Sequence, residues 1–176
     1  MEILIVGGAL VALMVYVSTR IKKSAARAYE RETVETEEFS LVKSEGFIIP
    51  VNENSEYVFE ARSKDYGDEE AHQFPKVSVK LKVSSDSNFE TVCRNTSSID
   101  NKITSENFPM DDSAKQKVCL LESKETESGI SFDVFHKIVE SSERRKIYDL
   151  KISVLQENRE QYDEQMNEMI ASFQVK

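Results

Sequence analysis

Tryptophan is absent from this sequence of 176 residues, and glycine, proline, histidine and cysteine are all rare. Five glycines and three prolines are too few for a disordered or low-complexity chain. Two cysteines, Cys93 and Cys119, are too few for a secreted disulfide scaffold, and they leave open either one bridge or two buried thiols. The sequence also lacks a glycine-rich phosphate loop, a CxxC pair and an HExxH motif, so no motif indicates a reaction.

The two histidines do not define a site in the sequence. The loop around His72 also carries Asp65, Asp68, Glu69 and Glu70. Such oxygen ligands could bind a divalent cation, but no regular spacing holds them, and a solvated loop is the simpler interpretation. His136 lies on an alternating apolar segment, where a nucleophilic Cys–His pair would need Cys93 or Cys119 beside it and an orienting acid. We therefore predict no catalytic, cofactor-binding or metal-binding residues, and a protein that is not an enzyme.

Charge is distributed unevenly along the chain. Residues 1–31 carry five basic and two acidic side chains, a net +3; since the whole chain has −9, the remaining residues carry −12. An acidic body does not suit nucleic acid, whose phosphates require neutralising Lys and Arg side chains. Its simplest role is solubility.

The longest apolar run is Ile3–Val17, which contains no charged side chain. A bilayer core of about 30 Å needs about 20 helical residues, and flanking residues with outward-reaching basic side chains extend the run to 1–22. A signal peptide would carry its positive charges before the run, whereas here they follow it. We therefore predict an uncleaved single-pass transmembrane helix over residues 1–22, with a signal peptide cleaved near Ser24-Ala25-Ala26 as the alternative.

The side chains in and after this run predict the orientation of the helix in the membrane and its contacts with lipid and with another helix. A basic cluster is expected to stay in the cytoplasm, which places the body on that side, with a periplasmic or lumenal body as the alternative. The same cluster suits anionic lipid and consists of Arg20, Lys22, Lys23 and Arg27. A face of small residues would let another membrane helix approach closely: Gly7, Gly8, Ala9 and Ala12. Asn95-Thr96-Ser97 fits the N-glycosylation pattern but conflicts with a cytoplasmic body.

Period-two alternation predicts a series of strands after a charged helical stalk or linker at 23–37. The predicted strands are 37–42, 47–50, 56–63, 76–83, 116–123, 130–139 and 146–156. A capping box at Ser87 and Glu90 predicts a short helix over 88–95, and Asn158 with Gln161 predicts the start of a second. The second helix has one apolar stripe, formed by Tyr162, Met166, Met169, Ile170 and Phe173.

These elements predict an α+β fold. A single N-terminal transmembrane helix would precede an α/β/α sandwich on a mostly antiparallel sheet. One face of the sheet would lie under the terminal helix, and the other under the helix at 88–95 and the connection after it. The expected divisions are the transmembrane helix at 1–22, the stalk at 23–37 and a globular domain at 38–176.

Two short segments at the ends of this domain carry a family resemblance. They are Gly46-Phe47-Ile48-Ile49-Pro50 and Ile170-Ala171-Ser172-Phe173. With the order of strands and helices between them, the chain resembles the PsbP-like domain family, named after an extrinsic protein of photosystem II. The resemblance implies an α/β/α sandwich and a non-enzymatic accessory role on a large membrane complex. The membrane helix departs from the cleaved targeting peptide of the lumenal members.

Together these features predict a non-catalytic, single-pass accessory or assembly subunit of a larger membrane-protein complex, and the resemblance suggests a photosynthetic or respiratory one. Its partners would be other membrane subunits, contacted through the small-residue face and the acidic domain, and anionic lipid. The alternative is a membrane-anchored ligand-binding or enzymatic domain that uses a pocket in the sandwich.

Overall fold

The structure is a computed structural model that describes residues 2–51, 55–85, 87–98 and 116–176, and of residues 2–12, 97 and 98 it describes the backbone alone. The helices are α1 (Glu2–Ala28), η1 (Glu69–Ala71), α2 (Phe89–Ser98), η2 (Gln156–Asn158) and α3 (Arg159–Ser172). The strands are β1 (Glu32–Glu35), β2 (Phe39–Lys43), β3 (Phe47–Ile48), β4 (Phe59–Ser63), β5 (Val77–Ser85), β6 (Gln116–Glu127), β7 (Ile130–Ser141), β8 (Lys146–Leu155) and β9 (Gln174–Val175).

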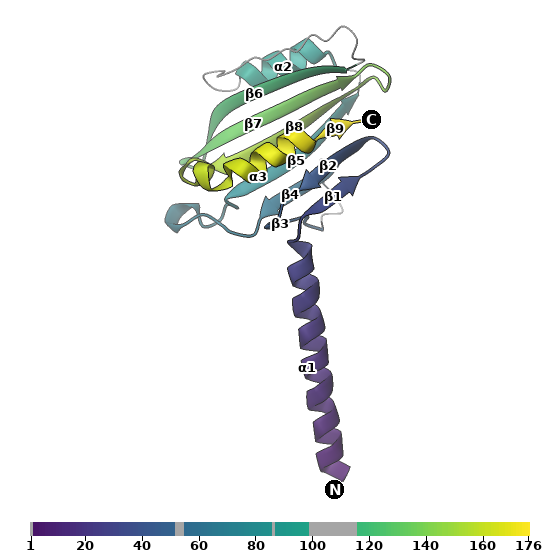
Figure 1. Cartoon of the computed structure of the whole chain (residues 1–176). Helices are drawn as coiled ribbons and strands as arrows, with labels where there is room; N and C mark the ends of the chain where they lie inside the picture. The colour runs from purple at the N-terminus through teal and green to yellow at the C-terminus, as the bar shows by residue number, and fades with distance from the viewer. Residues whose placement is uncertain (1, 52–54, 86, 99–115) are drawn as a thin grey trace.

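The strands form two sheets, in which the named pairings are antiparallel. The larger has the order β3-β4-β5-β8-β7-β6, and the smaller has the order β1-β2-β9. The smaller sheet and α3 lie over one face of the larger sheet, while α2 lies at its β6 end (Figure 1). The predicted mostly antiparallel sheet is thus observed, with an additional small sheet beside α3 in the layer over one face. The connection predicted to help cover the other face lies mostly outside the described residues.

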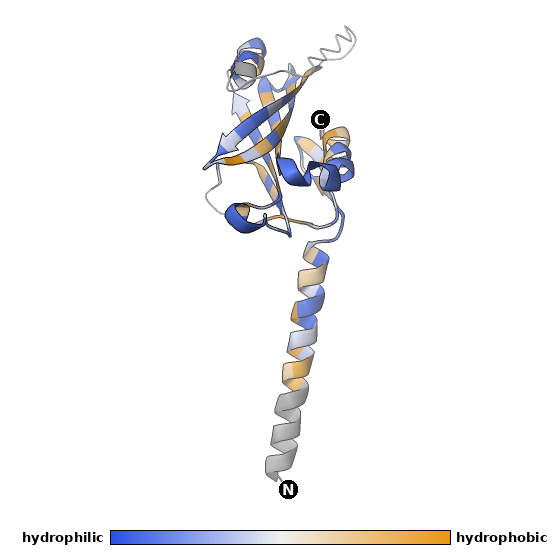
Figure 2. Ribbon diagram, turned by 90° about the vertical axis from the view of Figure 1, so that its left-hand side faces the viewer, coloured by the Kyte–Doolittle hydropathy of each residue, from blue (hydrophilic) through white to orange (hydrophobic). Residues whose placement is uncertain are grey.

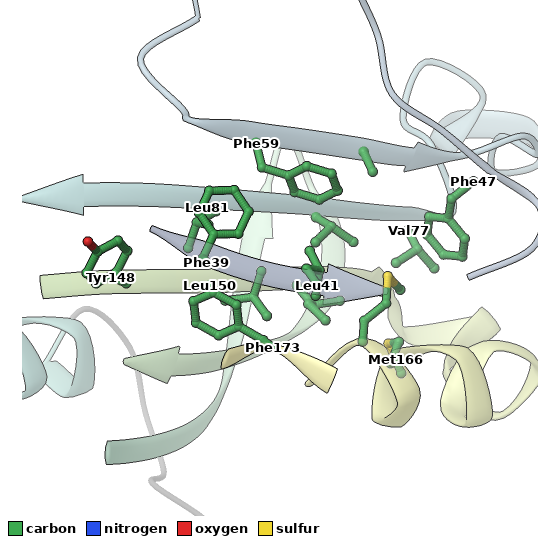
Figure 3. Close-up of a cluster of buried hydrophobic side chains, with 14 of the residues drawn as sticks. Phe39, Leu41, Phe47, Phe59, Val77, Leu81, Tyr148, Leu150, Met166 and Phe173 are labelled. Atoms are coloured by element: carbon green, nitrogen blue, oxygen red, sulfur yellow. The ribbon is translucent and has the colours of Figure 1, made fainter. Parts of the chain in front are cut away.

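The main core lies between the large sheet and the layer of β2 and α3. Val77, Val79 and Leu81 point into it from β5, as their alternation with polar residues predicted. Phe39 and Phe173 meet there with ring centroids 6.4 Å apart (Figure 3). Phe47 and Tyr162 make an edge-to-face contact, with ring centroids 6.2 Å apart.

The helices of the domain agree with prediction in position but not in their caps. The predicted stripe of α3 is buried at Tyr162, Met166, Met169 and Phe173, and Ile170 is partly buried. Asn158 precedes α3 but makes no side-chain capping hydrogen bond. At α2 the cap is Asn88, whose Oδ1 accepts a hydrogen bond from the Thr91 backbone N–H at 3.0 Å, so the prediction of Ser87 was one residue early.

The stalk predicted at 23–37 is wrong in its second half. α1 ends at Ala28, and residues 32–35 form β1, which pairs with β2. The short segment has only one inward apolar residue, Val34, so its strand structure depends on pairing with β2 and not on its own alternation.

The predicted transmembrane helix at 1–22 is also wrong. Among the residues that the structure describes, no helix combines the length and the apolar character needed to cross a membrane. The second half of α1 is polar, since Ser18, Thr19 and Arg20 follow Val17. The predicted single-pass topology and the predicted membrane location lose their basis with this helix.

Candidate interaction surface

The helix α1 projects away from the domain (Figures 1 and 2). Its described large apolar side chains are exposed. They are between 46% and 70% exposed: Leu13, Met14, Val15, Tyr16, Val17 and Ile21. Four of them, Leu13, Met14, Val17 and Ile21, follow helical spacing along one side and line a shallow groove with Ser18 and Lys22. We call these four residues the α1 ridge.

Basic side chains follow the ridge towards the domain. Arg20, Lys22, Lys23 and Arg27 are all exposed, and the sequence has no acidic residue between Leu13 and Ala28. Arg27 lies in the last turn, where a positive charge interacts favourably with the helix dipole. The four residues predicted to contact anionic lipid therefore form one positively charged section of an exposed helix.

A buried lysine fixes the base of α1. The Lys43 side chain is 1% exposed, and its Nζ donates to three carbonyls: Ala28 O at 3.2 Å, Glu30 O at 2.5 Å and Phe47 O at 2.9 Å. Burial lowers the pKa of Lys43, and the nearby Glu32 and Glu30 partly oppose that shift. Since Ala28 is the last residue of α1, this lysine binds the end of the helix to β2.

Further polar contacts hold the same junction. The Gly46 backbone N–H donates to Tyr29 O at 2.8 Å, and Gly46 has a φ of +86° that suits glycine. Arg31 Nε lies 2.7 Å from Glu168 Oε1 on α3, and Ser44 Oγ donates to Glu168 Oε2 at 2.6 Å. The Ser44 hydrogen bond and then Arg31 lower the pKa of Glu168. The chain leaving α1 is therefore joined to β2, the β2–β3 turn and α3.

The predicted small-residue face falls in the part of α1 that has backbone only. Gly7, Gly8, Ala9 and Ala12 lie within the helix, but their packing surface is outside the described side chains. The prediction that another helix contacts this face therefore stays a prediction.

The acidic loop forms a hollow with the ends of neighbouring strands. It has a volume of about 450 Å³, and its lining includes Asp68, Glu69, Glu70 and Glu157 together with the β6–β7 turn at Gly129. His72 is exposed, and its Nδ1 lies 2.6 Å from Glu69 O. Within the described ranges, no three His, Cys, Asp or Glu side chains are placed to hold a metal ion.

The second histidine has an acidic partner that the sequence interpretation missed. His136 Nδ1 lies 2.8 Å from Asp149 Oδ1, and the two residues come from β7 and β8. The predicted hairpin turn at 142–145 could have revealed this pair. Its register places Asp149 opposite Ile138, and His136 lies two residues from Ile138 on the same face of the sheet. The structure thus supplies an orienting acid for His136.

The cysteines contact each other instead of forming a nucleophilic pair. Cys93 on α2 and Cys119 on β6 are both buried thiols in one apolar cluster. The hydrogen bond with Cys119, followed by burial, raises the pKa of the Cys93 thiol, which disfavours the thiolate that a nucleophile requires. Asn95, the last residue of the helix predicted over 88–95, is part of α2, which continues to Ser98.

Comparison with known proteins identifies the fold but no family. No protein-family model matches the chain, and no curated protein matches it by sequence. Among solved structures it is similar to LpqN of Mycobacterium tuberculosis, described as involved in cell envelope biogenesis, with a TM-score of 0.59 and 10% identity over 83% of this chain and 90% of that one. It is also similar to the Saccharomyces cerevisiae Ran-binding protein Mog1p, with a TM-score of 0.54 and 11% identity over 84% and 96%.

LpqN and Mog1p share the PsbP/Mog1 fold, so this chain has that fold. CyanoP, the PsbP protein of Synechocystis sp. PCC 6803, aligns with a TM-score of 0.42 and 11% identity over 84% of this chain and 92% of that one, which is too weak to add to the argument. The resemblance to PsbP-like domains is confirmed for the fold of the globular part and not for a membrane anchor. Identities of 10–12% say nothing about function.

Proposed function

We propose that this chain is a non-catalytic accessory or assembly subunit that docks on a larger protein complex through α1. The observation that supports it is the α1 ridge, an exposed apolar surface on a helix whose base is bound to the domain by Lys43 and Glu168. Exposed apolar patches of this kind mark interaction sites. A fixed base orients the helix before it binds and so reduces the entropy that binding loses.

The charge beside the ridge indicates the partner. Arg20, Lys22, Lys23 and Arg27 suit a helix or groove that has its own apolar stripe flanked by carboxylates. Two copies of α1 packed in parallel would place these four charges against the same four, which is repulsive. The preferred occupant is therefore an acidic partner subunit and not a second copy of this chain packed in parallel.

The ridge supplies part of the free energy that binding needs. Burying one fully exposed Leu, Ile, Val or Met side chain is worth ~1.5–3 kcal/mol, and the four ridge residues are only 46% to 70% exposed, so together they contribute roughly 3–7 kcal/mol before the costs of association. A micromolar complex needs about 8 kcal/mol. Part of the surface of the partner must therefore also contact the basic section or the domain.

Isolation of complexes from native cells tests the proposal. We compare the full chain with Met14→Glu, which places a charge on the ridge, and with Ala26→Glu, which places the same charge on the opposite side of α1. The wild type and Ala26→Glu should co-purify with larger subunits at fixed stoichiometry, whereas Met14→Glu should be lost from them. Because Met14 is 70% exposed, its replacement should leave the melting temperature of the domain unchanged.

Retention of Met14→Glu at full stoichiometry would contradict the proposal. A monodisperse monomer carrying a bound small molecule would instead favour the alternative, a ligand-binding or enzymatic domain. The hollow beside Asp68 and Glu157 is the place where such a molecule would be sought. Under the proposal, replacing His136 leaves the activity of the complex unchanged.

A further inference from the structure

The helix α2 is held to the large sheet by a small apolar cluster separate from the main core. It contributes Phe89 and Cys93, which are one helical turn apart, and Val92 packs beside them. On the sheet side the cluster consists of Cys119, Leu121, Ile138 and Ile147. Lys117 Nζ adds a contact over the Phe89 ring, 5.9 Å from its centroid.

The two thiols face each other within this cluster. Cys119 points to the α2 side of the sheet because it is in register with Ile138, which belongs to the same cluster. Cys93 points down from α2, and the two side chains are joined by a hydrogen bond. Cys93 is 5% exposed and Cys119 is 1% exposed. The two thiols therefore lie together where α2 packs on the sheet, and this contact is the starting point for a disulfide.

We propose that Cys93 and Cys119 are a disulfide-forming pair that covalently joins α2 to β6 under oxidising conditions. A disulfide between these residues would lie in the middle of the cluster and replace a thiol–thiol contact by a bond. It would hold α2 on the sheet in addition to the packing of Phe89 and Val92. The assignment concerns the domain and is independent of docking through α1.

The reaction uses a small-molecule disulfide as the oxidant. The Cys93 thiolate attacks one sulfur of that disulfide and releases one thiol, leaving a mixed disulfide on Cys93. The Cys119 thiolate then attacks the Cys93 sulfur and releases the second thiol, so the two cysteine protons end on the two released molecules. Cys93 reacts first because it is the more exposed of the two.

Burial makes the folded, reduced protein slow to react. The hydrogen bond with Cys119, burial and the charge of Asp149 all raise the pKa of the Cys93 thiol. Oxidation therefore requires α2 to open, or it occurs while the chain folds. Mild denaturant should accelerate the reaction of the reduced protein with oxidised glutathione.

The test uses the purified full-length protein in buffers with graded ratios of reduced to oxidised glutathione. After equilibration, acid quenching and maleimide labelling under denaturing conditions, intact mass and peptide mapping give the product. The oxidised chain should be lighter by two hydrogen atoms, take up no maleimide and yield one cross-linked peptide joining Cys93 to Cys119. Its melting temperature should exceed that of the reduced form by roughly 5–10 °C.

Two single variants provide the control. Cys93→Ser and Cys119→Ser each retain one thiol, so neither should lose two hydrogen atoms within one chain. If either variant fails to fold, the cross-linked peptide of the wild type decides the matter by itself. Full maleimide labelling of both cysteines at every glutathione ratio would overturn the proposal, as would glutathione adducts or linked dimers in place of the internal bond.

Discussion

At the scale of single residues, Glu38 connects three parts of the domain. Its carboxylate accepts from Lys146 Nζ at 2.5 Å and from Tyr148 Oη at 3.1 Å, and its backbone carbonyl accepts from the Lys176 N–H at 2.9 Å. The hydrogen bond from Lys146 is the main reason that the pKa of Glu38 is lowered. Burial, followed by Glu38, raises the pKa of Tyr148 to about 12. The free energy of unfolding should therefore depend on the protonation of Tyr148 at alkaline pH.

Replacing Tyr148 by Phe should reduce the alkaline sensitivity of stability. Between pH 10.0 and about 12 the unfolded chain loses the Tyr148 proton while the folded chain keeps it. In this range the folded state binds more protons than the unfolded state. Tyr148 therefore contributes stability that is present below pH 10.0 and is lost as pH rises towards 12. Urea unfolding across this window should show a steeper loss for the wild type than for Tyr148→Phe. Tyr16→Phe, on the exposed part of α1, is the control, and an equal loss in all three proteins would contradict the assignment.

Replacing the buried Lys43 by Met should weaken the base of α1. The carbonyls of Ala28, Glu30 and Phe47 would each lose a donor, and a buried group left unsatisfied costs ~1–3 kcal/mol. Chemical denaturation should show a loss of about that size in the free energy of unfolding. The matched variant Lys64→Met, at an exposed position, should be near neutral. Equal stability of the two variants would show that the lysine does not hold the junction.

At the scale of elements, α3 is the helix on which the main core depends. Its buried residues face β2 and β8, and Lys137 Nζ donates to Ile170 O and Phe173 O at 2.8 Å each, which satisfies carbonyls at the end of the helix. Burial lowers the pKa of Lys137. Both apolar packing and a side-chain cap therefore hold the end of α3 where it leads into β9.

Truncating Phe173 to Ala should cost ~3–5 kcal/mol of unfolding free energy, because the ring is 1% exposed and packs against Phe39. A domain of this size has only ~5–15 kcal/mol in total, so the variant should be close to unfolding. Thermal and urea denaturation give the measurement. The control is Gln161→Ala on the exposed side of the same helix. An unchanged melting temperature in Phe173→Ala would show that α3 does not pack as described.

At the scale of the whole molecule, the chain has a self-contained domain and a projecting helix. The three apolar clusters found among the described residues contain none from α1. The helix meets the domain through its last turn and the residues that follow (Figure 1). Folding of the domain and presentation of the helix are thus separable.

A chain that starts at Tyr29 should therefore fold. It keeps Glu30 O and Phe47 O as acceptors for Lys43 and loses only Ala28 O, so the expected cost is at most ~1–3 kcal/mol. Circular dichroism and denaturation should give the spectrum and cooperativity of the globular domain, while co-purification with larger subunits disappears. Loss of cooperative unfolding would mean that α1 is part of the folding unit.

Local periodicity was sufficient for most of the domain. Alternation in 76–83 identified which side chains of β5 point inward, since a strand has a period of two whatever it pairs with. The stripe from Tyr162 to Phe173 identified the buried side of α3 in the same way. These properties depend on neighbours within a few residues, which the chain order already contains.

The remaining features depend on residues far apart in the chain. β1 and β9 are strands because each pairs with β2, which lies between them. The pairing of Asp149 with His136 needs the register of two strands. No local pattern places a lysine such as Lys43 among three carbonyls. In the apolar run of α1, hydropathy alone predicted a membrane span, and that prediction failed. Hydropathy measures only the free energy of transferring a side chain out of water. Which surface then covers an apolar side chain is decided by tertiary and quaternary contacts.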